Sequence, residues 1–307
     1  MLLLKVTLLL VLLGVTTASR GDRSPAYHKC VNACIQAAPE RTLPLALRLT
    51  RWTPTSDCMY TCQQSLTDAA LNGTVLDGLP PFQVVQFHGK WPFRRILGIQ
   101  EPLSVVFSAL NLWMHMRGRA RLQRELPTNL ARPLKTAYRI YPYLAFFAWI
   151  SSILFHTRDT PLTEKLDYFS AALSILWTLY IALLRFLHLS TRPTIRRLLL
   201  ISLGAVYLAH ISYLSLWKFD YAYNMLFNIL LGLTHNAIWF IWCGYHYLFS
   251  SPTSSLYPSP AKRGMEAVNE KPPHIHLPLI VLTGFMAAMG LEIMDFPRTS
   301  STLRFNS

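Results

Sequence analysis

The side chains best suited to chemistry gather in residues 151–170, between two apolar runs of the sequence. Ser152 and His156 are four residues apart, which places them on one face of a helix. Asp167 falls at the head of the following run and can face back across a short turn. Ionisable groups where two membrane helices meet are costly, so a functional site is the default hypothesis. A hydroxyl, an imidazole and a carboxylate would then converge at one membrane surface.

The same segment also has a simpler interpretation. His, Arg, Asp, Glu and Lys are ordinary residues in a loop at the level of the lipid head groups, and a single His there is usually solvated. Residue types and spacing alone leave both interpretations open. The choice between them depends on the elements that flank the segment.

The composition of those elements is that of a polytopic membrane protein. Of 307 residues, 52% are hydrophobic and only 14% are charged. Six apolar stretches, each close to the roughly 17–25 residues that span a bilayer, lie near 97–116, 140–156, 166–188, 198–217, 221–247 and 275–296. We therefore expect an all-α fold, with a bundle of about six transmembrane helices over residues 97–296 and a short polar tail over 297–307.

The net charge of +14 raises the question of a nucleic-acid partner. The Lys and Arg residues, however, gather between the apolar stretches, in segments such as 117–139. Because positively charged loops mark the cytosolic side of a membrane protein, the charge instead predicts a topology with a luminal N-terminus. The expected surroundings are membrane lipids, with no nucleic acid.

The N-terminal part of the sequence supports this topology. Residues 1–19 have a signal-peptide pattern, with Lys5 before an apolar run and small residues at the end. An uncleaved anchor is the alternative. We expect residues 20–96 to form a luminal domain, and Asn72 begins the sequon Asn-Gly-Thr, which predicts a glycosylation site there.

Four cysteines occur in this N-terminal domain as two CxxxC pairs: Cys30 with Cys34, and Cys58 with Cys62. In an oxidising compartment they suggest two disulfides. Since CxxxC aligns two thiols on one helical face, we favour a pair of helices joined twice. Zinc binding by these thiols is the weaker alternative, because structural zinc sites usually use CxxC. Cys243 lies in an apolar run and is expected to be a reduced core residue.

Three further polar residues could support the first cluster. Asp220 and Asp295 fall at the predicted luminal ends of their helices, and His210 lies about two helical turns from Trp217, roughly 10 Å along the helix. Together these residues could line a polar cavity. Each one alone is typical of a helix end or an interface.

Several sequence blocks spread over most of the chain are distinctive: QFHGKWPF (86–93), QEP (100–102), FHTRDT and LTEKLDYF (155–169), SYLSL (212–216), FDY (219–221) and DFP (295–297). In these blocks and their order, the chain resembles the family of post-GPI attachment to proteins factor 3, lipid-remodelling proteins of the secretory pathway. This family belongs to a group of seven-helix hydrolases that includes the alkaline ceramidases.

The resemblance implies a zinc-dependent hydrolase that removes the sn-2 acyl chain of the phosphatidylinositol in GPI anchors. It implies GPI-anchored proteins and their lipid as partners, in the Golgi or endoplasmic reticulum membrane. His156 matches a zinc ligand of the pattern, while Ser152 and Asp167 match residues that orient the attacking water or stabilise the oxyanion. The zinc would lower the pKa of a bound water to about 7.

The sequence departs from the family pattern in two places. It has four cysteines in the luminal domain where relatives tend to have six. After Asp295, the family continues into a last helix that carries two histidines as HxxxH, whereas this sequence ends in RTSSTLRFNS. We therefore expect a C-terminally truncated form with an incomplete zinc-ligand set. The alternative function is a non-catalytic member that binds GPI lipid or a partner without turnover, and a small heptahelical receptor is disfavoured.

Overall fold

The computed structural model describes residues 19–37, 42–249 and 275–294, which divide into two compact units. Unit 1 contains residues 19–114 and 147–167, and unit 2 contains residues 115–146 and 168–294. The described residues form helices, turns and three isolated β-bridges, so the predicted all-α class is confirmed. The body of the expected signal peptide, Asp295 and the expected polar tail lie outside the described residues.

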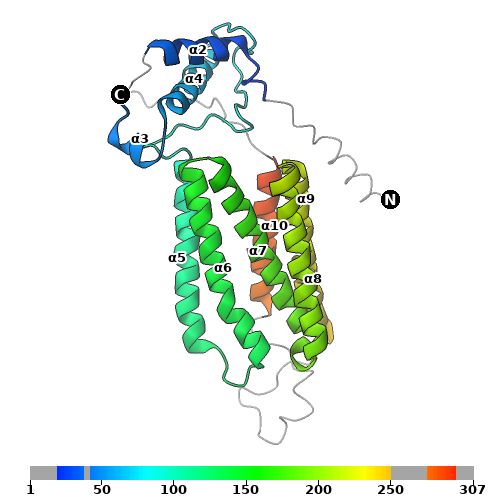
Figure 1. Cartoon of the computed structure of the whole chain (residues 1–307). Coiled ribbons are helices and arrows are strands. Elements are labelled where there is room, and N and C mark those ends of the chain that lie inside the picture. Colours follow the sequence, from blue (N-terminus) through cyan, green and yellow to red (C-terminus); the bar gives the residue numbers. More distant parts are fainter. Residues whose placement is uncertain (1–18, 38–41, 250–274, 295–307) are drawn as a thin grey trace, which may run out of the picture. The chain divides into compact units, whose positions relative to one another are not determined.

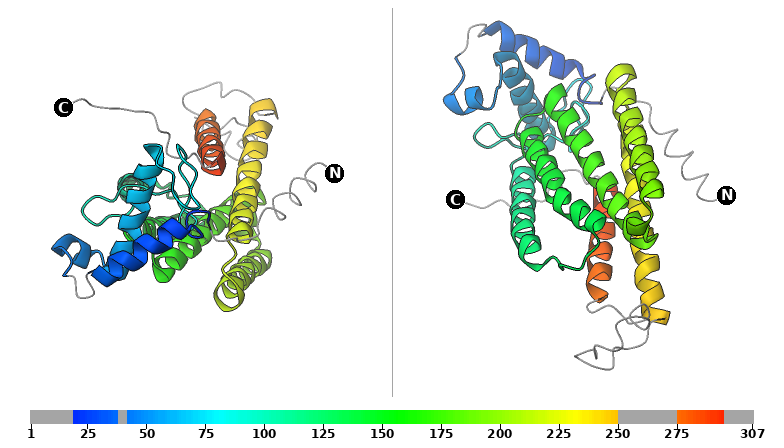
Figure 2. Two further views of the ribbon diagram at one scale, coloured as in Figure 1. Left: turned by 90° about the horizontal axis from the view of Figure 1, so that it is seen from above. Right: turned by 60° about the horizontal axis from the view of Figure 1, so that its bottom comes forward.

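Unit 1 begins with the cysteine-containing helices α2 (Pro25–Ala37), α3 (Leu45–Leu49) and α4 (Pro54–Leu71). Two disulfides, Cys30–Cys62 and Cys34–Cys58, join α2 to α4, and Figure 2 shows these two helices packed together. This is the doubly joined pair of helices that the CxxxC spacing predicts, because residues four apart share a helical face. The remaining cysteine, Cys243, is buried and has a free thiol.

Local sequence defines both ends of α4. The Thr53 hydroxyl accepts a hydrogen bond from the Ser56 backbone N–H (3.2 Å), and the Ser56 hydroxyl accepts one from the Thr53 N–H (2.9 Å), which is a capping box. Pro54 follows at a position where its missing N–H is tolerated. At the other end Asn72 is the exposed C-cap, and Gly73 continues at a φ of 81°. The sequon therefore lies at an accessible helix end.

A tight turn begins the segment that leads to α5 (Pro102–Glu125). Phe87 and Lys90 exchange backbone hydrogen bonds of 2.8 and 2.9 Å around His88 and Gly89. Both central residues have positive φ, 50° and 74°, as in a type I′ turn. Glycine tolerates this conformation without strain. The turn directs the chain back on itself and fixes the position of Lys90.

A second turn of the same kind joins Ile96 to Ile99, whose backbones exchange hydrogen bonds of 3.1 and 2.9 Å. Its Gly98 has a φ of 84° and packs closely against α3, since a Cβ atom there would lie 2.9 Å from the Ala46 carbonyl oxygen. The indole N–H of Trp52 donates to the Gly98 carbonyl at 2.8 Å. The cysteine-containing domain thus holds this segment through its backbone.

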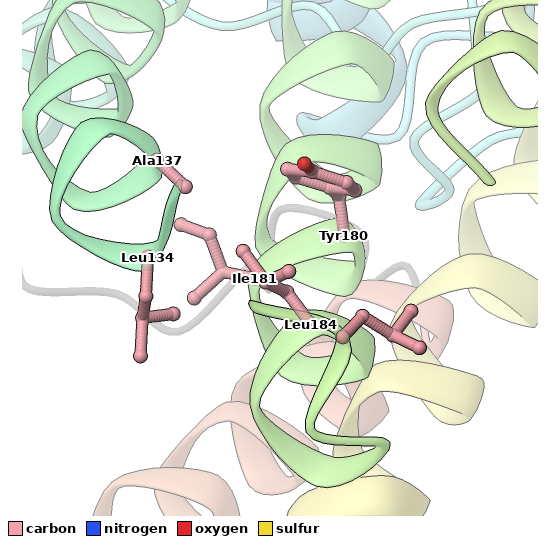
Figure 3. Close-up of a cluster of buried hydrophobic side chains, with 6 residues drawn as sticks. Leu134, Ala137, Tyr180, Ile181 and Leu184 are labelled. Atoms are coloured by element: carbon pink, nitrogen blue, oxygen red, sulfur yellow. The ribbon is translucent and has the colours of Figure 1, made fainter. Parts of the chain in front are cut away.

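Unit 2 contains the longer helices. It shares three helices with unit 1: the end of α5, most of α7 (Pro161–Phe186) and the first part of α6 (Arg132–Thr157). Its other elements are η1 (Leu189–Thr191), α8 (Pro193–Ser212), the π-helix η2 (Tyr213–Trp217), α9 (Tyr221–Phe249) and α10 (His276–Met294). Figure 1 shows α7 to α10 running roughly parallel to one another. In the main core cluster, Ile181 and Leu184 of α7 pack with Leu134 and Ala137 of α6 (Figure 3). The Trp177 indole N–H donates to the Ala137 carbonyl at 3.0 Å.

Four of these elements are long and apolar enough to cross a membrane: α6, α7, α8 with η2, and α9. In α10 the qualifying apolar stretch is shorter, over His276–Gly290. Large apolar side chains such as Ile201 and Leu208 are exposed on α8, as expected for helices whose outer faces contact lipid. The six predicted apolar stretches each correspond to one helix from α5 to α10.

The helices extend beyond the predicted apolar stretches. The expected charged loop over 117–139 is largely helical, because α5 continues to Glu125 and α6 begins at Arg132. Charged residues are good helix formers, and Arg121 pairs with Glu125 one helical turn away at 2.8 Å. Hydropathy therefore located the apolar parts of these helices but not their polar ends, and α5 is not among the four candidate spans.

Candidate active site

A turn of three residues brings the predicted cluster together in unit 1. Helix α6 ends at Thr157 and α7 begins at Pro161. The Thr160 hydroxyl accepts a hydrogen bond from the Thr163 N–H (3.3 Å) and the Thr163 hydroxyl accepts one from the Thr160 N–H (2.9 Å), so α7 also starts with a capping box. This short connection places the first two turns of α7 beside the last two turns of α6.

A chain of hydrogen bonds runs through Ser152. Its hydroxyl lies 3.0 Å from the Ser108 hydroxyl of α5 and also bonds to the Asp167 carboxylate. An ionised carboxylate only accepts, so Ser152 donates to Asp167 and Ser108 donates to Ser152. Ser152 is only 8% exposed. The chain holds a buried hydroxyl in one orientation at the junction of three helices.

A second polar group surrounds His156. Its Nδ1 lies 2.8 Å from Oε2 of Glu101, and Lys90 Nζ lies 2.9 Å from the other carboxylate oxygen, Oε1. The same ammonium lies 2.9 Å from Asp159 Oδ2 and 4.0 Å from the centre of the Phe155 ring. The two carboxylates and the ring together enclose the single ammonium charge.

This arrangement determines the ionisation of Glu101 and Lys90, which both lie outside the candidate membrane spans. Burial alone would raise the pKa of Glu101, but the hydrogen bond from His156 and the charge of Lys90 outweigh it and lower the pKa to about 2. Burial likewise opposes the charge of Lys90, but Glu101 and Asp159 raise its pKa above the ordinary value. Glu101 and Lys90 are therefore both charged at neutral pH. The ionised Glu101 carboxylate accepts a hydrogen bond from the Nδ1–H group of His156.

The backbone connects the same residues. The N–H groups of Gln100 and Glu101 donate to the carbonyls of Thr157 and His156, each at 3.0 Å. The last carbonyls of a helix have no partner within the helix, so the segment before α5 satisfies the end of α6. Glu101 is thus bound to His156 through both its side chain and its main chain.

A cavity of about 50 Å³ opens against this group of charges. Since one water needs roughly 10–15 Å³ of such volume, it has room for about three waters. Its walls carry donors and acceptors from unit 1. The lining residues are Tyr60, Gln63, Phe87, His88, Lys90, Trp91, Phe93, Gln100, Glu101 and Asp159.

The sequence profile of the Per1-like family matches residues 44–304. The chain belongs to the Per1-like family. This confirms the resemblance to the post-GPI attachment factor 3 family that the motifs indicated.

Three curated relatives of this Per1-like chain illustrate the match. The Protein PER1 homolog of Schizosaccharomyces pombe is 38% identical over 91% of this chain and 78% of its own length. The GPI-specific phospholipase A2-like PGAP3 of Cricetulus griseus is 38% identical over 78% of this chain and 74% of its own length. Post-GPI attachment to proteins factor 3 of Drosophila melanogaster is 32% identical, over 95% and 84% respectively. No solved structure matches the chain.

The possible support residues have local roles within unit 2 of this Per1-like fold. Asp220 precedes α9 and accepts a hydrogen bond from the Tyr223 N–H at 3.0 Å, which is the role of a helix cap. His210 is 1% exposed and stacks on Phe227 with ring centres 3.8 Å apart. Support of the Ser152 cluster by these residues stays a prediction, and Asp295 lies outside the described residues.

Sequence reasoning missed Glu101, Lys90 and Ser108 as site residues. Glu101 and Lys90 lie in the QEP and QFHGKWPF blocks, which were noted for their resemblance to the family. One signal was present: Glu101 is an acid within the predicted apolar stretch near 97–116, where charge is costly. Its partner His156 is 55 residues away, so no local pattern could connect the two.

The described residues do not by themselves fit a zinc ion. Within 19–37, 42–249 and 275–294, no group of three or more His, Cys, Asp or Glu side chains is arranged to hold a metal. A catalytic zinc usually takes three protein ligands. Of the residues predicted for this chemistry, only His156 offers an imidazole beside Asp167.

Proposed function

We propose that this Per1-like membrane protein remodels GPI anchors by hydrolysing the ester that attaches the sn-2 acyl chain of their phosphatidylinositol. Two findings support the proposal. Relatives similar over most of the chain carry the names GPI-specific phospholipase A2-like PGAP3 and Post-GPI attachment to proteins factor 3. The observation that carries the chemistry is the convergence of Ser152, Asp167, His156 and Glu101 where α6 meets α7.

The described residues could serve ester hydrolysis in distinct ways. With Nδ1 bonded to Glu101, Nε2 is the imidazole atom of His156 left to hold the proposed zinc, which would lower the pKa of an attacking water. Ser152 donates to Asp167 and accepts from Ser108, so its remaining lone pair can accept a hydrogen bond from the attacking water and orient it. The polar cavity behind Glu101 supplies water to a place that lipid would otherwise keep dry.

We propose zinc as the cofactor, with His156 as one ligand. The described residues hold no group of three or more metal-binding side chains, so the proposal includes further ligands from outside the described ranges. Metal analysis of the purified full-length protein tests this. We expect close to one zinc per chain, and a loss of zinc in His156→Ala. A metal-free protein that still hydrolyses the lipid would contradict the zinc proposal.

We propose a luminal N-terminus in the Golgi or endoplasmic reticulum membrane, with GPI-anchored proteins as partners. Two disulfides are typical of proteins that fold in an oxidising compartment. Asn72 is exposed at the end of α4, where a glycan could be attached.

The direct test is complementation of cells that lack GPI-lipid remodelling. We expect the wild-type protein with its full set of zinc ligands to remove the sn-2 acyl chain, as measured by mass spectrometry of GPI lipids, and Ser152→Ala and His156→Ala in that protein to fail while inserting normally. The second candidate is a non-catalytic member that binds GPI lipid, which the incomplete ligand set among the described residues favours. Binding of GPI lipid without any change in its acyl chains would support that candidate.

A further inference from the structure

We propose that Glu101 is a positioning residue for His156 and that Lys90 holds Glu101 in place. This role in orienting the His156 imidazole rests on the proposed function. Three contacts define it: Nδ1 of His156 to Oε2 of Glu101 at 2.8 Å, Oε1 of Glu101 to Lys90 at 2.9 Å, and Lys90 to Asp159 at 2.9 Å.

Both carboxylate oxygens of Glu101 have a charged or hydrogen-bonding partner. A carboxylate held at one oxygen can still rotate about its side-chain bonds, whereas one held at both oxygens is confined to a single orientation. The side chain is 12% exposed, so water offers little competition for either bond. Glu101 therefore presents one fixed acceptor to His156, which selects the tautomer protonated at Nδ1 and leaves Nε2 for the reaction.

Lys90 is held in place by contacts that do not involve His156. Its backbone closes the turn with Phe87, and its ammonium contacts Asp159 and the face of the Phe155 ring. A buried ammonium without partners would be strongly unfavourable, so the two carboxylates and the cation depend on each other. Removing the Lys90 ammonium would leave the Glu101 and Asp159 carboxylates close together without a positive charge between them.

The segment that carries both positioning residues is held by the disulfide-joined domain. The Tyr60 hydroxyl and the Gln64 amide of α4 both donate to the Phe93 carbonyl, and Arg95 pairs with the buried Asp57. Tyr60 and Asp57 flank Cys58 on α4, which is bonded to Cys34 of α2. A continuous set of contacts within unit 1 thus runs from the disulfides to the imidazole.

The test compares turnover of a GPI phospholipid by the purified full-length protein in nanodiscs. We expect Glu101→Gln to lower kcat by roughly 10–100-fold with KM within about twofold, since the residue orients a reacting group and does not contact lipid. Lys90→Met should lower kcat similarly, and Lys90→Arg should recover most of it, because a guanidinium can bridge the same carboxylates.

Asp68→Asn is the matched control. It removes an exposed ion pair between the same segment and α4, Arg94 to Asp68 at 2.9 Å, and should leave kcat unchanged. A Glu101→Gln protein with wild-type kcat would overturn the proposal. So would a loss in Asp68→Asn equal to that in Glu101→Gln, because it would show that any weakening of the segment has the same effect.

A second measurement does not depend on hydrolysis. Nitrogen-15 NMR of the histidine-labelled protein distinguishes the two imidazole tautomers, and the His156 signal is assigned by its absence in His156→Gln. With bound metal removed by a chelator, we expect wild type to show Nδ1–H alone and Glu101→Leu to show a mixture of tautomers. Unchanged signals in Glu101→Leu would overturn the positioning role. If wild type shows the single tautomer but hydrolyses no lipid, the proposed function fails while the positioning role stands.

Discussion

Protonation of Glu101 should destabilise the protein at acidic pH. The ordinary pKa of a glutamate is 4.5, and in the folded protein it is about 2. A carboxyl whose pKa is lower in the folded state contributes stability above its unfolded pKa and loses it as the pH falls toward the folded pKa. The contribution is thus complete above about pH 5 and decreases between pH 5 and pH 2.

The size of the effect follows from the two pKa values. The difference between 4.5 and about 2 corresponds to about 3 kcal/mol at neutral pH. At pH 3 the same relation leaves about 1 kcal/mol, so about 2 kcal/mol is lost between pH 7 and pH 3. Because the Glu101 side chain is only 12% exposed, solvent screening reduces this value little.

The assay is unfolding of the purified full-length protein in detergent, followed by tryptophan fluorescence from pH 7 to pH 3, for wild type and Glu101→Gln. Other carboxyls titrate in both proteins, so the relevant quantity is the difference between their free energies of unfolding. We expect wild type to be more stable at pH 7 and the difference to shrink by about 2 kcal/mol at pH 3. Parallel curves would show that Glu101 has an ordinary pKa, and the ionic contacts assigned to it would then be wrong.

Three other substitutions test separate parts of the structure. Ser152→Ala should reduce lipid hydrolysis at least roughly 100-fold in the nanodisc assay, whereas Ser151→Ala, its buried neighbour, should retain activity. Gly98→Ala should destabilise the protein by about 1–3 kcal/mol in the fluorescence assay, because it places a Cβ 2.9 Å from the Ala46 carbonyl oxygen at a φ of 84°. Asn72→Gln should abolish an endoglycosidase-sensitive shift in gel mobility, and wild type without that shift would count against a luminal N-terminus.

Local periodicity predicted the parts of the fold and site that depend on near neighbours. Ser152 and His156 share a helical face because they are four residues apart, and a short turn returns Asp167 to the same region. The same reasoning predicted the joining of α2 to α4, since each CxxxC pair presents two thiols on one face. In both cases the spacing is itself the geometric constraint.

Periodicity could not predict contacts set by irregular backbone. Lys90 reaches Glu101 because a turn with two residues at positive φ, His88 and Gly89, reverses the chain before it. Asp220 shows a second limit, because its position in the sequence was clear but its role was not. An acid at a helix end is equally suited to a catalytic cavity and to capping its own helix. In the structure it caps α9, a role that the sequence could not distinguish from the first.

The arrangement in unit 1 suggests why this membrane protein carries a disulfide-joined domain. Within a bilayer, apolar side chains gain little by packing against each other, because the lipid is equally apolar. The end of a spanning helix therefore needs polar contacts to be held. At the end of α6, Gln100 and Glu101 supply them by bonding to the carbonyls of Thr157 and His156. These two residues are in turn held by a segment that contacts α4, so the position of His156 depends on a domain that lies outside the candidate spans.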